Sequence, residues 1–103
     1  MEKIIYTTGF TKDLDRITDF LIEIDPNLCG ETVGLIFEAT DILARHPWIG
    51  RPVEEGLREL LIAQGRNGYV ALYRFRKDLA QVHILAIRHQ REIGYANNEP
   101  DNN

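Results

Sequence analysis

Apolar and polar residues alternate along the second half of the chain with the two-residue period that is typical of β-strands. Residues 57–64, 69–76 and 81–89 form three apolar-rich segments of strand length. Residues 65–68, which include two glycines and an asparagine, and residues 77–80 separate these segments as short turns. The pattern predicts a meander of three antiparallel strands.

The first half of the chain begins with a short strand and then changes to the helical period. Residues 4–8 are rich in β-branched side chains and predict a strand, which Gly9 is expected to break. Thr11 is expected to be the N-cap of a helix, because apolar residues recur at helical spacing after it. Pro26 disfavours helical backbone at the residue before it, so this helix is expected to end there.

A second helix is predicted over residues 30–45, because an apolar stripe at helical spacing runs through this segment until Pro47 stops it. Residues 46–56 contain two prolines and two glycines and therefore predict a loop. Three apolar residues of this loop are expected to anchor it on the core: Trp48, Ile49 and Val53.

These elements together predict an α+β fold. The two helices are expected to form an antiparallel hairpin against a three- to four-stranded antiparallel sheet, which the N-terminal strand can join. A chain of 103 residues is expected to form one domain. That domain is expected to span residues 1–95, followed by a polar and flexible tail at residues 96–103.

The net charge of −4 hides an asymmetry between the two halves of the chain. Residues 1–55 carry eleven acidic and five basic side chains, whereas residues 57–95 carry three acidic and seven basic ones. The formal charges of the two segments are therefore −6 and +4. This balance argues against a general nucleic-acid binder, which is normally basic overall, but it allows a local basic surface for an acidic or anionic partner.

Strand alternation predicts which side chains share a face of the sheet. In the strand at residues 69–76, one face carries Val70, Leu72, Arg74 and Arg76, and the other carries Tyr69, Ala71, Tyr73 and Phe75. In the strand at residues 81–89, one face carries Val82, Ile84, Ala86 and Arg88, and the other carries His83, Leu85, Ile87 and His89. The arginines can bind phosphate or carboxylate in bidentate fashion, or simply form ion pairs with the acidic helices on a solvated face.

The end of the last strand offers the best candidates for acid–base chemistry. His89, which is followed closely by Arg91 and Tyr95, could transfer a proton at a phosphodiester. Arg91 or Arg58 could stabilise the charge that develops in such a reaction. The alternative is structural, with His89 packing or capping the edge of the sheet.

Several other classes of function receive no support from the sequence. Three scattered histidines and the single Cys29 lack metal-ligand spacing, and no glycine-rich phosphate loop precedes a helix, so neither a metal nor a cofactor is predicted. No apolar run is long enough for a membrane span, and the N-terminus lacks the apolar centre of a signal peptide. The protein is therefore expected in the cytoplasm, without a membrane partner.

The order of elements and a set of local motifs resemble the RelE/ParE superfamily of bacterial type II toxins. The resemblance extends over residues 4–95, and its most specific motifs are FTKDLDRITDFL, HPWIGRPV, LRELLI, GYVALYRF and VHILAIRHQRE. The resemblance implies a toxin of a toxin–antitoxin system that is neutralised by a cognate antitoxin encoded beside it. It also implies that operator DNA is bound only through the antitoxin.

The superfamily divides into two kinds of activity. RelE-like members cut mRNA on the ribosome with Lys and Arg plus a Tyr or His, whereas ParE-like (plasmid stabilisation) members inhibit DNA gyrase without an established nucleolytic site. The present sequence is closer to the ParE branch in residues 57–75 and 84–91, and its sheet half contains a single lysine, Lys77. Its net negative charge is also unfavourable for docking to ribosomal RNA.

The two activities assign different tasks to the candidate residues. For a gyrase inhibitor, which is not an enzyme, the expected target-binding residues are Arg58, Arg74, Arg88, His89 and Arg91. For a ribosome-dependent mRNA endonuclease, the expected catalytic candidates are Arg58, His89, Arg91 and Tyr95. A third possibility is a member that has lost its toxicity and only binds its antitoxin.

Overall fold

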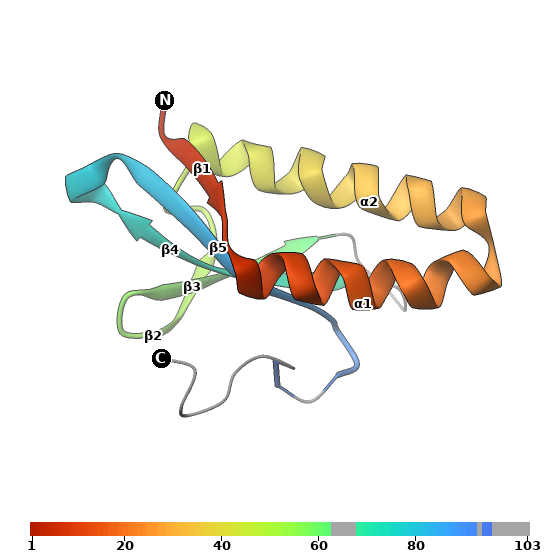
Figure 1. Cartoon of the computed structure of the whole chain (residues 1–103). Coiled ribbons are helices and arrows are strands. Elements are labelled where there is room, and N and C mark those ends of the chain that lie inside the picture. Colours follow the sequence, from red (N-terminus) through yellow and green to blue (C-terminus); the bar gives the residue numbers. More distant parts are fainter. Residues whose placement is uncertain (63–67, 93, 96–103) are drawn as a thin grey trace.

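A computed structural model describes residues 1–62, 68–92 and 94–95 of the chain (Figure 1). Its principal elements are β1 (Lys3–Tyr6), α1 (Thr8–Ile24), α2 (Pro26–Asp41), β2 (Arg51–Glu54), β3 (Leu57–Ile62), β4 (Tyr69–Arg76) and β5 (Gln81–His89). Short 3-10 turns follow α2 at Ile42–Ala44 and β4 at Lys77–Leu79. Most of the predicted turn at 65–68, the end of the predicted strand at 57–64 and the predicted tail at 96–103 lie outside the described residues.

The strands form one five-stranded sheet in the order β1-β5-β4-β3-β2. The α+β fold is confirmed, and the meander β3-β4-β5 is antiparallel as predicted. The N-terminal strand joins the sheet by pairing parallel to β5. The fifth strand, β2, pairs with β3 and lies within the segment that was predicted to be a loop, so that prediction is wrong for these four residues. All four residues are exposed, and the sequence RPVE lacks the alternation of apolar and polar residues that would indicate a strand.

Helix α1 starts one turn earlier than predicted, because its N-cap is Thr7 and not Thr11. The Thr7 hydroxyl accepts a hydrogen bond from the Phe10 N–H at 3.3 Å and donates one to the Ile84 carbonyl at 2.8 Å. Gly9 lies inside the first turn of α1, where a Cβ would come within 2.7 Å of the Leu85 carbonyl oxygen. Gly9 therefore allows the helix to pass close to β5 instead of breaking the chain.

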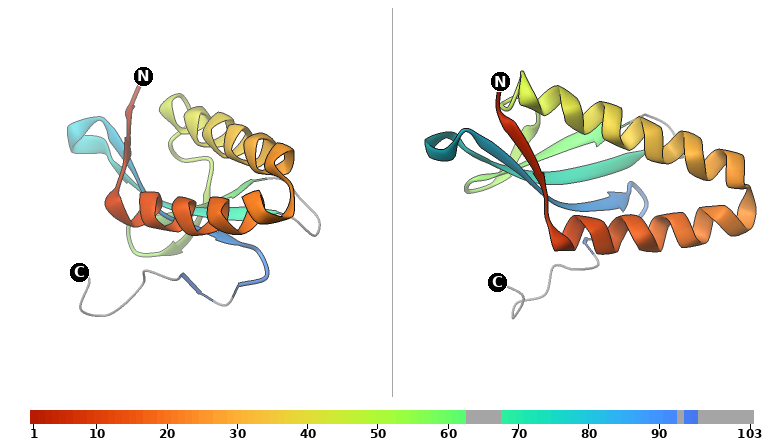
Figure 2. Two further views of the ribbon diagram at one scale, coloured as in Figure 1. Left: turned by 45° about the vertical axis from the view of Figure 1, so that its right-hand side comes forward. Right: turned by 45° about the horizontal axis from the view of Figure 1, so that its top comes forward.

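Helices α1 and α2 are connected by the single residue Asp25, which is the C-cap of the first and the N-cap of the second. The Asp25 carboxylate accepts a hydrogen bond from the Asn27 N–H at 3.0 Å, and Pro26 occupies the first turn of α2, where a missing N–H costs nothing. The predicted start of the second helix at Gly30 is therefore wrong by about one turn. The two helices lie side by side and antiparallel, on one face of the sheet (Figures 1 and 2).

The core lies between the helix pair and the sheet. Its largest fully buried side chains include Phe10, Ile36, Leu43, Tyr73 and Ile84. No helix among the described residues is long and apolar enough to cross a membrane.

The segment between α2 and β2 is anchored by Tyr73, which is fully buried. The Tyr73 hydroxyl accepts a hydrogen bond from the Gly50 N–H at 2.8 Å and donates one to the Pro47 carbonyl at 2.9 Å. The predicted anchors are largely exposed instead, at 55% for Trp48, 58% for Ile49 and 40% for Val53. The prediction that these three residues hold the loop on the core is therefore wrong.

An irregularity at Leu85 changes which side chains of β5 share a face. Ile84 pairs with Tyr73, but four residues later Arg88 pairs with Val70, so Leu85 is left without an opposite residue. Directly paired residues of antiparallel strands point to the same face. Ile84 therefore faces the helices while Arg88 faces the other side, and the predicted common face of Val82, Ile84, Ala86 and Arg88 is split in two.

Candidate functional site

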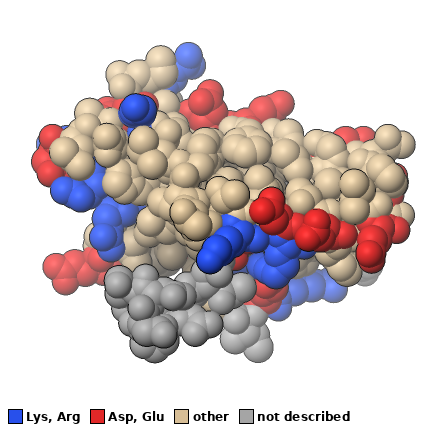
Figure 3. Space-filling model, in the orientation of Figure 1, with Lys and Arg blue, Asp and Glu red and all other residues tan. Residues whose placement is uncertain are grey.

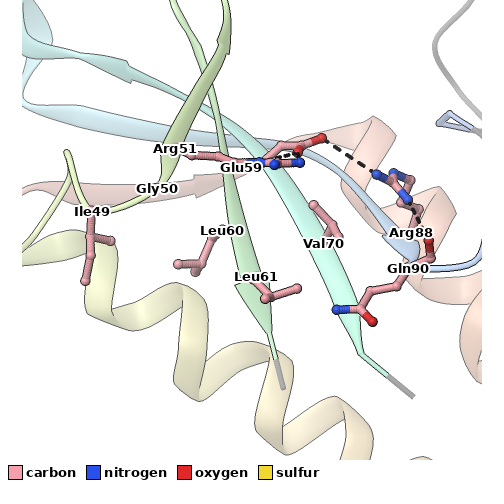
Figure 4. A pocket seen from close by; sticks show the side chains of 9 residues that line it. All are labelled: Ile49, Gly50, Arg51, Glu59, Leu60, Leu61, Val70, Arg88 and Gln90. Atoms are coloured by element: carbon pink, nitrogen blue, oxygen red, sulfur yellow. Dashed lines mark hydrogen bonds and ion pairs between the residues drawn. The ribbon is translucent and has the colours of Figure 1, made fainter. Parts of the chain in front are cut away.

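The face of the sheet opposite the helices carries a cluster of polar side chains from three strands and the segment after β5. Glu59 of β3 lies at its centre, with Arg51 of β2 on one side and Arg88 of β5 on the other (Figure 4). Tyr95, six residues beyond the end of β5, completes the cluster by reaching back to Glu59. We call these four residues the Glu59 cluster.

Glu59 is bonded to all three other members of the cluster. Its Oε1 accepts hydrogen bonds from Arg51 Nη2 at 2.8 Å and from Arg51 Nε at 3.3 Å. Its Oε2 accepts a hydrogen bond from the Tyr95 hydroxyl at 2.6 Å and forms a longer ion pair with Arg88 Nη2 at 3.9 Å. The Glu59 side chain is 9% exposed, so the carboxylate is almost enclosed by its partners.

Arg88 is held by the segment that follows its own strand. Its Nη1 donates to the carbonyl oxygens of His89 and Gln90, each at 3.3 Å, and of Glu92 at 3.1 Å. Its guanidinium carbon lies 5.0 Å from the centre of the Tyr95 ring, which is a cation–π distance. Arg88 therefore fixes the path of the chain between β5 and Tyr95.

Burial and the Glu59 carboxylate together oppose the loss of a proton from Tyr95. Burial raises the pKa of the Tyr95 phenol, and its hydrogen bond to the Glu59 carboxylate and the charge of that carboxylate raise it further. Burial also acts to raise the pKa of Glu59, but the hydrogen bonds from Tyr95 and Arg51 and the charges of both arginines together lower it. At neutral pH the phenol is therefore a hydrogen-bond donor and Glu59 is an anion.

A shallow open concavity of about 500 Å³ adjoins the Glu59 cluster. Leu61 of β3 and Val70 of β4 give it an apolar wall, and Leu61 is half exposed. Among the described residues there is no group of three His, Cys, Asp or Glu side chains that could hold a metal ion.

Arg58 and Arg74 lie outside the Glu59 cluster. Arg58 is on the helix side of β3, where its Nη1 donates to the carbonyls of Trp48 at 3.0 Å and Gly50 at 2.7 Å. Arg74 is exposed on β4, opposite His83 of β5. The predicted binding residues therefore do not form one surface.

His89 and Arg91 lie on the helix side of the sheet, next to α1. The His89 ring contacts the edge of Tyr69 at a centroid distance of 5.3 Å, and its Nδ1 accepts the Arg91 N–H at 3.1 Å. Both residues line a second concavity of about 460 Å³ together with Phe20 and Arg16 of α1. His89 pairs with Tyr69, and so points away from the face on which Arg88 lies.

The structure thus distributes the predicted residues over four places: Arg88 and Tyr95 lie in the Glu59 cluster, His89 and Arg91 lie together beside α1, and Arg58 and Arg74 each lie apart. Two members of the cluster, Arg51 and Glu59, were not among the site residues predicted from the sequence. Glu59 carried a signal, because it is the only acidic side chain in residues 57–76, where the other charges are all arginines. Among the described residues, no arginine of the candidate set pairs with an acid of α1 or α2.

The sequence matches the family described as the ParE toxin of type II toxin–antitoxin systems over residues 4–94. The chain belongs to this family, within the RelE/ParE superfamily. Two relatives from Caulobacter vibrioides are each 33% identical to this toxin: Toxin RelE3 over 81 residues, which are 79% of this chain and 86% of the relative, and Toxin RelE1 over 86 residues, which are 84% and 90%.

Solved structures agree with the family assignment. A chain of the chromosomal ParDE system from P. aeruginosa superimposes with a TM-score of 0.71 at 27% identity, covering 86% of this toxin and 96% of that chain. A chain of the RelBE2 toxin–antitoxin complex from Mycobacterium tuberculosis shares the fold, with a TM-score of 0.54 at 24% identity and coverages of 86% and 98%. The predicted membership of the superfamily is confirmed, and this chain is a type II toxin.

Proposed function

We propose that this toxin arrests growth by binding and inhibiting DNA gyrase, and that a cognate antitoxin neutralises it in the cytoplasm. The family match to ParE toxins supports this proposal over the rest of the superfamily. In this proposal the toxin is not an enzyme and works through its surface, and it contacts operator DNA only through the antitoxin.

The observation that carries the proposal is the position of Glu59. Its carboxylate occupies the space between the two arginines of the Glu59 cluster, where a phosphodiester held by both guanidinium groups would have to lie. A buried anion at that place repels a phosphate and competes with it for the same guanidinium groups. The open face is therefore poorly suited to bind RNA for cleavage.

Proton transfer on the open face is also poorly supported. The Tyr95 phenol donates to Glu59, and its raised pKa keeps it protonated at neutral pH, so the phenolate that could accept a proton is not populated. His89 lies on the other side of the sheet, and the lone pair of its Nδ1 is already engaged by the Arg91 N–H. Within the part of the chain that the structure describes, Tyr95 and His89 therefore do not face a common substrate position as general acid and base.

The second candidate function is a ribosome-dependent mRNA endonuclease. The names of the two Caulobacter relatives favour it, because both are RelE toxins. The adjacent Arg88 and Tyr95 would be its most suitable pair, with the guanidinium 5.0 Å from the ring. Such an activity would require Tyr95 and Arg88 to leave Glu59 when RNA binds.

A cognate antitoxin is supported by the structural relatives, since one is described as a ParDE system and the other as a RelBE2 complex of toxin and antitoxin. The charge distribution also suits an acidic partner segment. On the face shown in Figure 3, acidic side chains line the right-hand half of the helix pair, basic side chains gather near its centre, and both kinds lie at the β4–β5 end.

The proposed activity can be tested in one culture that expresses the toxin alone. We expect plasmid DNA to lose negative supercoils within the period of growth arrest, while reporter transcripts stay full length. Shortened transcripts with normally supercoiled plasmid would instead establish the endonuclease. A variant with a disrupted core, Tyr73→Ala, serves as the unfolded control.

A further inference from the structure

The only tryptophan of the chain is exposed at the tip of a turn between α2 and β2. The Ile49 N–H donates to the His46 carbonyl at 3.2 Å, which places Pro47 and Trp48 at the centre of a β-turn. Trp48 is 55% exposed and its neighbour Ile49 is 58% exposed. Burying such side chains in a partner would release a large apolar area from water.

The backbone of this turn is fixed by two side chains from the sheet. The Tyr73 hydroxyl bonds to Pro47 and Gly50, and the Arg58 guanidinium bonds to the carbonyls of Trp48 and Gly50. At Gly50 a Cβ would lie 2.6 Å from the Glu59 carbonyl and from the Tyr73 ring, so the loop packs without spare room. None of these contacts uses the indole ring of Trp48.

The indole ring itself is also oriented. The Arg58 guanidinium carbon lies 4.9 Å from the ring centre, and the Phe75 ring meets it edge-on at 4.8 Å. A partner therefore meets a side chain that is already ordered, which lowers the entropic cost of binding. Tryptophan next to arginine is the composition typical of the energetic centre of a protein interface.

We infer that Trp48 is the anchor residue by which the toxin contacts its protein target, an inference that rests on the proposed inhibition of gyrase. Trp48 is exposed at the tip of the turn, so its ring can enter a pocket on a folded partner, whereas a wrapping antitoxin segment needs a groove or a strand edge. Exposed Arg45 and His46 immediately precede the turn, and Arg58 lies against the ring. The target pocket is therefore apolar with carboxylates at its rim.

A nucleic acid fits this surface less well than a protein does. Affinity for RNA or DNA depends on neutralising several phosphates, and the chain carries a net charge of −4. The turn also offers one exposed aromatic ring, whereas single-stranded nucleic acid is bound by several stacking side chains along a basic groove.

The inference is tested with Trp48→Ala, Trp48→Phe and the control Ile22→Ala, whose wild-type side chain on α1 is also 55% exposed. We expect Trp48→Ala to require at least about tenfold more protein than the wild type for equal inhibition of gyrase supercoiling, which is the loss expected for an interface anchor. Trp48→Phe should be intermediate and Ile22→Ala unchanged. Thermal melting followed by far-ultraviolet circular dichroism confirms that each variant is folded.

A Trp48→Ala protein that is folded and as potent as the wild type would overturn the inference. Growth arrest on expression is compared in parallel, because it does not depend on the identity of the target. If the wild type arrests growth without inhibiting gyrase, the proposed function falls, and the comparison of Trp48→Ala with the wild type in the growth assay still decides the role of Trp48.

Direct contact is measured by fluorine NMR of the full chain with fluorotryptophan at Trp48, which gives one signal because the chain has one tryptophan. We expect purified gyrase to shift or broaden this signal, and a single-stranded RNA to leave it unchanged. An unchanged signal at gyrase concentrations where supercoiling is inhibited, or a response to the RNA alone, would overturn the inference.

Discussion

The hydroxyl of Tyr95 donates a hydrogen bond of 2.6 Å to the carboxylate of Glu59, 36 residues earlier in the chain. This bond ties the segment after β5 to the open face of β3, and Arg88 lies against both partners. The three side chains thus form one unit in which the negative charge of Glu59 offsets the positive charge of Arg88. Because Glu59 already pairs with Arg88, this surface is better suited to stabilising the fold and contacting a protein than to binding phosphate.

The first prediction concerns the two residues best able to move a proton. We expect the double variant His89→Ala, Tyr95→Phe to retain growth arrest, because neither side chain has a catalytic task in a gyrase inhibitor and the loss of one expected target contact, His89, weakens binding without abolishing it. Loss of the Tyr95 hydrogen bond should lower the free energy of unfolding by about 1 kcal/mol. Loss of toxicity by a variant that circular dichroism shows to be folded would favour the endonuclease.

The second prediction concerns the pH dependence of Glu59. Its pKa is lowered in the folded state, despite the opposing effect of burial, by Tyr95, Arg51 and Arg88. The stabilisation by the carboxylate is therefore present above the ordinary glutamate pKa of about 4.3. It is lost as the pH falls through the lower pKa that Glu59 has in the folded protein. Glu59→Gln should be less stable than the wild type by about 1 kcal/mol at neutral pH in urea unfolding.

The difference between Glu59→Gln and the wild type should shrink as the solution is made acidic. A difference that stays constant with pH would mean that the charge of Glu59 does not stabilise the cluster. Glu54→Gln on the exposed strand β2 provides the matched control, and we expect its stability to follow the wild type.

The third prediction concerns Asp13, a fully buried acid of α1. Its Oδ2 accepts the Ile87 N–H at 3.0 Å, and its Oδ1 lies 3.8 Å from Arg16. Burial raises the pKa of Asp13 more than the bond to Ile87 and the charge of Arg16 lower it. Its contribution to stability is therefore largest below the ordinary aspartate pKa of about 3.9. It is lost as the pH rises through the higher pKa that Asp13 has in the folded protein.

Asp13→Asn keeps an oxygen that can accept the Ile87 N–H but does not titrate. We expect the stability of this variant, relative to the wild type, to increase from acidic to neutral pH in urea unfolding. A relative stability that decreases over this range would show that Asp13 is stabilised as an anion. Asp13→Ala should be destabilised at every pH, because it leaves the Ile87 N–H without this acceptor.

The fourth prediction concerns Gly50, which sits under the Trp48 turn. A Cβ at this position would lie 2.6 Å from a backbone oxygen of β3 and from the buried Tyr73 ring, neither of which can move freely. Gly50→Ala should therefore lower the free energy of unfolding by about 1–3 kcal/mol.

Gly34→Ala is the matched control for this change. Gly34 lies within α2, and a Cβ there would meet no atom within 4 Å. Because alanine is the better helix former, Gly34→Ala should raise the free energy of unfolding by up to about 1 kcal/mol. Equal effects of the two substitutions in denaturant unfolding would contradict the tight packing at Gly50.

The sequence predicts the elements with strong apolar periodicity. β4 and β5 match their predicted ranges, Pro26 correctly marks the junction of the helices, and the helix hairpin packs on the sheet. Errors occur where local rules allow two interpretations. Gly9 suggests the end of a strand in the sequence but is a point of close approach in the structure. Strand β2 is fully exposed, and its sequence RPVE shows no alternation of apolar and polar residues.

The candidate site was harder to predict, because its assembly depends on the register of β5. Simple alternation puts Arg88 on the same face of the sheet as Ile84. The irregularity at Leu85 shifts the alternation by one residue, so Arg88 lies on the open face instead. Glu59 acquires its role only from contacts with Arg88 and Tyr95, which lie 29 and 36 residues away. Such contacts leave no local pattern in a single sequence.

The central claim is tested most directly by the supercoiling activity of purified gyrase, with the antitoxin-free toxin titrated into the reaction. We predict that supercoiling falls as the toxin is added, and that protein denaturation at the end of the reaction releases cleaved plasmid. Gyrase that remains fully active in the presence of folded toxin, together with cleavage of mRNA on ribosomes by the same preparation, would contradict the account.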